Sequence, residues 1–135
     1  MLNGLPGVAL SGEHYGYIRE LRSIEHKVER TSHMHGPAWQ HRPFNKDKFY
    51  CWARSLLEID ESKKITGFKE IRYNDFEMLE FLVRLFPSAK FLITYRNELA
   101  EQLKSHHKAH GFSTTSVDKL RAETQALLDF HQRYP

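Results

Sequence analysis

The sequence predicts an α/β fold in which a parallel sheet is flanked by helices on both faces, giving three layers. Short apolar, β-rich runs occur at 7–13, 64–73 and 90–95, and a stretch with helical periodicity follows each of them. Strands that alternate with helices form βαβ units, whose strands lie parallel in one sheet. Because the chain has 135 residues and no internal repeat, we expect residues 1–135 to form a single domain.

The first strand is expected in GVALSGE (7–13), an apolar run bounded by glycines. A helix from Tyr15 to about Thr31 should follow, because five residues recur at helical spacing: Ile18, Leu21, Arg22, Glu25 and Val28. Glycine and proline mark the segment 32–45 as a loop. The next helix, about Lys46 to Ile59, carries an apolar stripe of Phe49, Trp52, Ala53, Leu56 and Leu57.

The second strand is expected in KITGFKEIRY (64–73), and Asp75 is a suitable N-cap for the helix that follows it. This helix should end near Phe86, before Pro87, with a core face of Phe76, Leu79, Leu82 and Val83. The third strand is expected at 90–95, in KFLITY.

Two more helices, about 98–109 and 116–133, complete the predicted elements. The first should end at Gly111, and the second should be capped by Ser116.

The composition is that of an ordinary globular protein, with 40% hydrophobic and 27% charged residues. The formal net charge of +3 permits an anionic ligand but is too small to indicate a nucleic-acid-binding protein. The N-terminal segment lacks the basic region and long apolar core of a signal peptide, so we expect a cytoplasmic protein. Cys51 is the only cysteine, so the chain cannot form an internal disulfide. We expect Cys51 to be a small buried side chain on a helix.

The most informative position is Arg96, the first residue after the predicted strand at 90–95. In an open parallel sheet, ligands bind outside the carboxyl ends of the strands. A guanidinium at that edge can bind a phosphate through two parallel hydrogen bonds, and the Ser105 hydroxyl, nine residues further on, can add another. A surface ion pair between Arg96 and Glu98 explains an arginine at this position equally well.

GFKEIRY followed by LEFLVRLFPSAKFLITYRN and a serine resembles the PAPS-dependent sulfotransferases, particularly bacterial members and the tyrosylprotein sulfotransferases. The resemblance implies a P-loop-type sulfotransferase fold that transfers a sulfuryl group from 3′-phosphoadenosine-5′-phosphosulfate (PAPS) to a hydroxyl or amine. It also implies that Arg96 and Ser105 bind the 3′-phosphate of this cofactor. One departure is Asn97-Glu98, which stands where many members have Asp-Pro.

The resemblance extends to MLNGLPGVALSGEHYG and implies that Glu13 is the catalytic base. Sulfuryl transfer requires that the acceptor hydroxyl lose its proton as it attacks sulfur, and a carboxylate at the carboxyl end of a strand can accept that proton. Without the resemblance, Glu13 is equally well explained as a glutamate favoured at the N-terminus of a helix.

Two family segments are not found in the chain. The phosphosulfate loop, a Gly/Ser/Thr-rich turn after an N-terminal strand, is expected before Met1, and a further strand and a C-terminal loop are expected after Pro135. We therefore expect a fragment of a sulfotransferase domain that is inactive by itself. We also expect an open sheet edge that favours self-association.

Other candidate residues carry weaker signals. His106, His107 and His110 lie close enough on one helix to hold a metal, but no acidic or cysteine ligand is near, and a solvated surface is the simpler interpretation. Lys69 and Arg72 follow the second strand, and their roles stay open. Residues 33–43 lie where related enzymes carry acceptor-binding loops, with Trp39, His41 and Arg42 as candidates, although a plain exposed loop is the simpler interpretation.

Two alternative functions remain. One is a non-catalytic α/β remnant that serves as a binding or interaction module, and the other is a P-loop-type phosphoryl-transfer enzyme. The sequence does not identify the acceptor, because acceptor pockets in the sulfotransferase family are built from variable loops.

Overall fold

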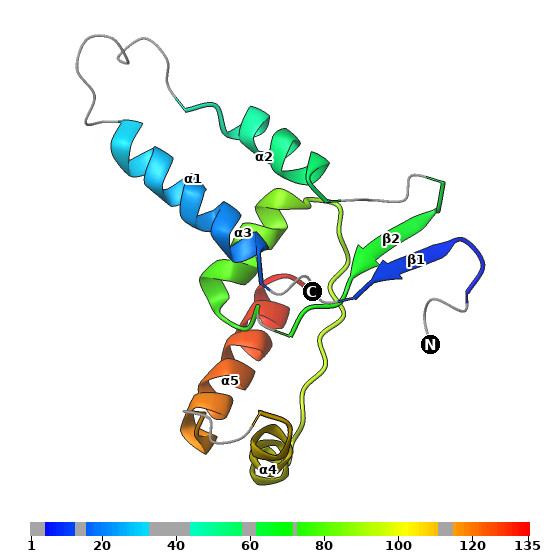
Figure 1. Ribbon diagram of the computed structural model, residues 1–135, viewed down its shortest axis with the longest axis vertical. Coiled ribbons are helices and arrows are strands. Elements are labelled where there is room, and N and C mark those ends of the chain that lie inside the picture. The colour runs from blue at the N-terminus through cyan, green and yellow to red at the C-terminus, as the bar shows by residue number, and fades with distance from the viewer. Residues whose placement is uncertain (1–4, 13–15, 33–43, 58–61, 72, 111–114) are drawn as a thin grey trace. The chain divides into compact units, whose positions relative to one another are not determined.

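The computed structural model describes residues 5–12, 16–32, 44–57, 62–71, 73–110 and 115–135 (Figure 1). Within these residues the protein is a mixed α/β structure that is mostly helical, with five helices and a two-stranded parallel sheet. The chain divides into two compact units. The N-terminal unit comprises Met1–Tyr73 with Arg84–Pro87, and the C-terminal unit comprises Asn74–Val83 with Ser88–Pro135. The expectation of one domain stays a prediction.

The sheet pairs β1 (Val8–Ser11) with β2 (Ile65–Phe68) in parallel, with Val8 opposite Ile65 and Ser11 opposite Phe68. This pairing confirms the predicted parallel arrangement of the first two strands. Gly67 allows a close approach across the sheet, because a Cβ atom there would lie 3.0 Å from Leu10 Cδ2. Only a residue without a side chain therefore fits opposite Leu10 without displacing it.

The N-terminal unit contains α1 (Ile18–Ser32) and α2 (Lys46–Ser55), both close to their predicted positions. The buried face of α1 consists of Ile18, Leu21 and Glu25, three members of the predicted helical pattern. Helix α2 begins where the Asn45 side chain accepts a hydrogen bond from the Lys48 N–H at 2.9 Å. An asparagine at this position satisfies one of the unpaired N–H groups at the start of the helix.

The buried face of α2 differs from the predicted stripe. Phe49, Tyr50 and Ala53 are buried, whereas Trp52 and Leu56 are 47% and 48% exposed. The expectation of a buried Cys51 was also wrong, because this thiol is exposed. The helix presents Tyr50 to the interior instead, where the tyrosine hydroxyl has polar partners.

Those partners form a polar triad in which Glu25 and Tyr50 are buried and the side chain of Arg84 is 44% exposed. The Tyr50 hydroxyl donates to Glu25 Oε1, and Arg84 donates to Tyr50 Oη at 3.1 Å and to Glu25 Oε2 at 3.2 Å. Glu25 is only 3% exposed, so its carboxylate depends on these two partners. The triad joins α1, α2 and the end of α3 within the N-terminal unit.

The triad also shifts two pKa values. Burial, followed by the hydrogen bond to Glu25, raises the pKa of Tyr50 to about 12. Burial works to lower the pKa of Arg84, but the hydrogen bond with Tyr50 and the charge of Glu25 outweigh it, so the pKa of Arg84 is raised. Tyr50 is therefore neutral and Arg84 charged at neutral pH.

The helices α3 (Phe76–Leu85), α4 (Leu99–His110) and α5 (Val117–Arg133) begin within one residue of their predicted starts. Both predicted N-caps are confirmed: Asp75 Oδ1 accepts from the Met78 N–H at 2.8 Å, and Ser116 Oγ accepts from the Lys119 N–H at 3.2 Å. Local capping chemistry thus fixes these helix starts.

Phe130 forms the centre of the C-terminal unit and is fully buried. Its ring makes edge-on contacts with Phe76, 6.5 Å away between centroids, and with Phe91, 5.3 Å away. Near the same helix end, Arg133 forms an ion pair with Glu80 at 3.0 Å. Residues from α3, α5 and the segment before α4 therefore share one aromatic core.

The prediction of a third strand at 90–95 was wrong. Residues 90–95 belong to no sheet, and within the described part of the chain their backbone makes no hydrogen bond to another segment. The sequence has the side chains of a strand, but strand structure also requires a neighbouring backbone to pair with. In Figure 1 the chain between α3 and α4 runs as an extended coil.

A tyrosine titration tests the triad. The pKa values of Tyr50 and Tyr73 are both raised from 10.0 to about 12. The stability that these two tyrosines contribute while protonated is therefore complete below pH 10 and is lost as the pH rises to 12. We expect tyrosinate absorbance to show a late step that coincides with alkaline unfolding. Tyr50→Phe should reduce this step, and Tyr95→Phe, a change at an exposed residue, should not. A late step that Tyr50→Phe leaves unchanged would contradict the burial of Tyr50.

Candidate functional site

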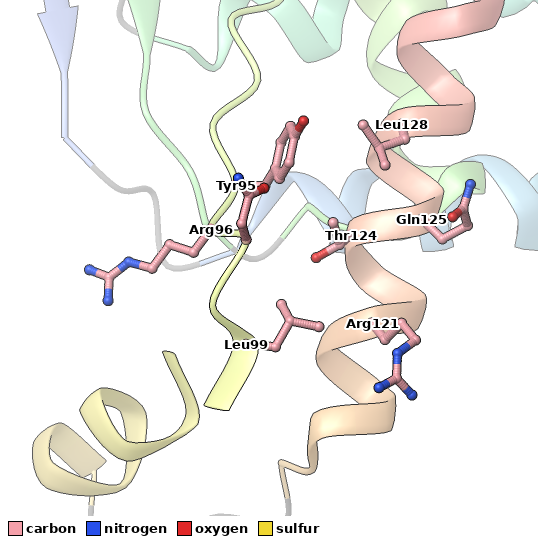
Figure 2. Close-up of a pocket in the computed structure, with 8 residues that line it drawn as sticks. Tyr95, Arg96, Leu99, Arg121, Thr124, Gln125 and Leu128 are labelled. Carbon is pink, nitrogen blue, oxygen red and sulfur yellow. The ribbon is translucent and has the colours of Figure 1, made fainter. Parts of the chain in front are cut away.

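The surface around Arg96 forms a shallow pocket of about 320 Å³ in the C-terminal unit (Figure 2). Its wall is built from the end of the extended segment, the start of α4 and one face of α5. The lining residues are Tyr95, Arg96, Asn97, Leu99, Arg121, Thr124, Gln125 and Leu128. The lining thus combines hydroxyl, amide and guanidinium groups with two leucines, which is a composition suited to a polar ligand with an apolar part.

The side chains in this pocket do not all point inward. Figure 2 shows Leu99 and Thr124 between the extended segment and α5, whereas the Arg96 guanidinium extends away from α5. Thr124 Oγ1 donates to the Leu120 carbonyl at 2.9 Å, and Arg121 pairs with Asp118 at 2.7 Å. Arg96 is therefore the cationic group at the pocket with the most freedom to bind a ligand.

The alternative ion pair between Arg96 and Glu98 is not formed. Both residues are exposed, and in the part of the chain that the structure describes neither takes part in an ion pair. Arg96 lies three residues before the first residue of α4. The unpaired N–H groups at a helix start attract anions, and a guanidinium beside them adds to that attraction.

Ser105 lies on α4 and is exposed, but it does not line the pocket. Glu101, in the first turn of α4, forms a surface ion pair with Lys104 at 2.7 Å, which reduces the negative charge near the helix start. The structure thus presents Arg96 and Ser105 on one surface-exposed stretch without bringing them together in a common contact. Their joint role in phosphate binding stays a prediction.

At the carboxyl ends of β1 and β2, the described polar contacts centre on Glu70. Its Oε2 accepts from the Gly16 N–H at 3.0 Å, and its Oε1 accepts from its neighbour, the Ile71 N–H, at 2.9 Å. Gly16 has a φ of 79°, a conformation that glycine adopts without strain. Glu70 therefore connects the end of β2 to the start of α1. Glu13 and Arg72 lie outside the described residues.

Tyr73 makes the second connection at the start of α1. Its hydroxyl accepts a hydrogen bond from the Ile18 N–H at 3.0 Å. Burial raises the pKa of Tyr73 to about 12, although the hydrogen bond from Ile18 acts in the opposite direction. Lys69, by contrast, is exposed, and its backbone N–H donates to the Ser11 carbonyl at 3.2 Å.

Sequence reasoning missed the roles of Glu70, Tyr73 and Tyr50. A usable signal was available for Tyr50: Glu25 lies on the apolar face of a predicted helix, and a charge in that position needs a partner. The signal for Glu70 and Tyr73 was weaker. They follow a predicted strand, where polar side chains can reach the start of a helix, but no spacing rule selects them.

The histidine cluster shows no metal site in the described residues. The His106 and His107 rings lie 6.5 Å apart between centroids in an edge-on arrangement, and the His110 side chain is outside the described part. Among the described residues, no group of three His, Cys, Asp or Glu side chains is placed to hold a metal ion. The same residues include no helix with the length and apolar character needed to cross a membrane.

Comparison with known proteins leaves the family open. No family model, curated protein or solved structure matches this chain. The sulfotransferase resemblance therefore depends on the short motifs around Glu13, Arg96 and Ser105.

The role of Glu70 can be tested by Glu70→Gln. The amide keeps one acceptor oxygen, so one of the two backbone N–H groups loses its charged partner, and we expect unfolding to become easier by about 1–2 kcal/mol. Glu20→Gln is the matched control, because Glu20 is an exposed carboxylate in the first turn of α1. Urea denaturation should show a loss of roughly 0.5 kcal/mol or less for the control. Equal losses for the two variants would mean that only charge, and not hydrogen bonding, matters at this helix start.

Proposed function

We propose that this chain is part of a PAPS-dependent sulfotransferase domain in which Arg96 and Ser105 bind the 3′-phosphate of the nucleotide. The observation that carries the proposal is the exposed guanidinium of Arg96 directly before α4, with no ion pair in the described chain. A phosphate bound there would meet the fork of N–H donors of the guanidinium.

The same proposal includes a three-layer sulfotransferase fold for the domain. The parallel pairing of β1 with β2 and the regular succession of helices support a larger parallel sheet with helices on both faces. Ligands of open parallel sheets bind outside the carboxyl ends of the strands.

In the same proposal, the Ser105 hydroxyl is the second group that binds the 3′-phosphate. It is the seventh residue of α4, so its position along the helix is roughly 9 Å from that of Leu99. The long side chain of Arg96 must therefore fold back along α4 for both groups to contact one phosphate. Because Ser105 is exposed, a bound phosphate can approach its hydroxyl.

The proposed reaction uses Glu13 as the base. The carboxylate takes the proton of the acceptor hydroxyl while the hydroxyl oxygen forms a bond to sulfur. The bond between sulfur and the phosphate oxygen breaks, and 3′,5′-bisphosphoadenosine leaves. Strand β1 ends at Ser11, two residues before Glu13, so the proposal places the base just beyond the carboxyl end of β1.

A non-catalytic interaction module is the second candidate, and one observation favours it. Several large apolar side chains are more than half exposed, among them Leu92 at 79%, Ile65 at 59% and Ile71 at 58%. Exposed apolar surface of this kind is typical of proteins that bind other proteins. Failure to bind the nucleotide, with a stable fold, would favour this candidate.

The nucleotide proposal is tested by calorimetry on the whole chain with 3′,5′-bisphosphoadenosine and with 5′-AMP. We expect the bisphosphate to bind more tightly, and Arg96→Ala should weaken its binding by roughly 1.5–3 kcal/mol while changing AMP binding little. Arg121→Ala is the control, because Arg121 lines the same pocket but pairs with Asp118. Equal affinity for the two nucleotides would exclude the assignment of Arg96 to a 3′-phosphate.

The role of Glu13 requires a turnover assay in a longer form that carries a phosphosulfate loop before Met1. Glu13→Gln keeps the shape of the side chain but cannot accept the proton, so turnover should fall about a hundredfold or more. Cofactor affinity should stay the same, which separates a loss of proton transfer from a loss of binding. Unchanged turnover would leave Glu13 with a role at the helix start only.

A further inference from the structure

Helix α4 is held in the C-terminal unit by a half-buried face. None of the residues 99–108 is buried. The half-buried residues of the helix lie three or four positions apart on one side and are Leu99, Gln102, Leu103 and His106. Helix α5, against which α4 packs, contributes the buried Leu120 and Phe130 instead. Because burial of an apolar face supplies most of the stability of a helix in a protein, α4 is the less firmly held of the two.

One side chain on the half-buried face of α4 opposes the packing of this helix. Gln102 Oε1 is buried and has no hydrogen-bond partner among the described residues. A buried polar atom without a partner has lost the hydrogen bonds that water gives it in the open state. Separation of α4 from its neighbour therefore recovers part of the free energy that its packing supplies.

Helices α3 and α5 are tied together by contacts that α4 lacks. Arg133, the last residue of α5, pairs with Glu80 of α3 at 3.0 Å, and its guanidinium lies 5.6 Å from the centre of the Phe76 ring. The Tyr134 hydroxyl donates to the same Glu80 carboxylate at 3.4 Å. An ion pair, a hydrogen bond and ring contacts thus act between the same two helices.

The chain that leads into α4 does not tie the helix to its surroundings. Within the described residues, the backbone at 92–98 makes no hydrogen bond to any segment except α4 itself. Phe91, just before this stretch, is held against Phe130. The ion pair between Lys104 and Glu101 lies within α4. A hinge in 92–98 can therefore let α4 move away without breaking the hydrogen bonds inside either helix.

We propose that α4 separates from α5 and opens as one unit in the native protein, while α3 and α5 stay packed together. Native proteins open in such cooperative units, and those with few buried apolar contacts open most readily. Leu99 of α4 lines one side of the pocket at Arg96, and Thr124 and Leu128 of α5 line the other (Figure 2). Opening therefore removes one wall of the pocket, and a ligand that contacts both walls favours the closed state. The inference depends only on contacts within the C-terminal unit and does not need the proposed sulfotransferase activity.

Hydrogen exchange on the whole chain, followed by mass spectrometry, tests the opening directly. Each measured rate is divided by the rate of an unstructured peptide of the same sequence, so that the ratio reports the opening equilibrium. We expect the amides of 99–108 to exchange at least about a hundredfold faster than those of 120–130 in α5, and at similar ratios along the helix. Equal protection of the two helices would overturn the proposal, because they would then open only together. A steady rise in protection from one end of α4 to the other would also overturn it, since that pattern indicates fraying.

The variant Gln102→Leu tests the contribution of the buried amide oxygen. Leucine and glutamine have similar helix propensities, so the change acts on the packing of α4 and not on its intrinsic helicity. We expect exchange in 99–108 to slow by about tenfold or more, because the open state no longer gains a solvated amide and the closed state gains apolar contact. Exchange in 120–130 should stay the same.

The matched control is Gln132→Leu, the same substitution at an exposed position of α5. It should leave exchange in α4 unchanged, and circular dichroism checks that both variants are folded. Unchanged exchange of α4 in Gln102→Leu, or equal slowing by the two variants, would overturn the proposal.

Discussion

The N-terminal unit depends on one buried carboxylate. Glu25 is 3% exposed, and an ionised group in that position is tolerated only with charged or hydrogen-bonding partners. Tyr50 and Arg84 supply them from two other segments, so the packing of α1 against α2 and the end of α3 is tied to a single set of polar contacts. Because the Arg84 side chain is 44% exposed, solvent screens its charge, and the ion pair contributes less than a fully buried one would.

The connection between the sheet and α1 also depends on hydrogen-bond partners for polar groups. The first N–H groups of a helix need partners outside the helix, and here Tyr73 provides one for Ile18, the first residue of α1, while Glu70 accepts from the Gly16 N–H two residues before the helix. Both side chains come from the segment after β2. The polar contacts at the carboxyl ends of the strands thus connect the segment after β2 to the start of α1.

The C-terminal unit is organised differently, around apolar contacts. Phe130 gathers Phe76 and Phe91 into an aromatic core, which positions the extended segment that carries Arg96. Hydrophobic contacts fix one face of that segment but do not satisfy its backbone. Among the described residues, the Arg96 guanidinium has no ion pair and the backbone at 90–95 makes no hydrogen bond to another segment, and both features lie in this one stretch of the chain.

The sequence alone determined the features that depend on neighbours along the chain. It placed all five described helices and the parallel strands β1 and β2, and it identified Asp75 and Ser116 as caps, because capping and helical periodicity act over three or four residues. Tertiary structure decided what depends on distant partners. Tyr50 turned inward in place of Trp52 because Glu25 and Arg84 accept and donate hydrogen bonds there. The stretch 90–95 has the side chains of a strand but is not one in the structure, because a strand exists only where a second backbone pairs with it.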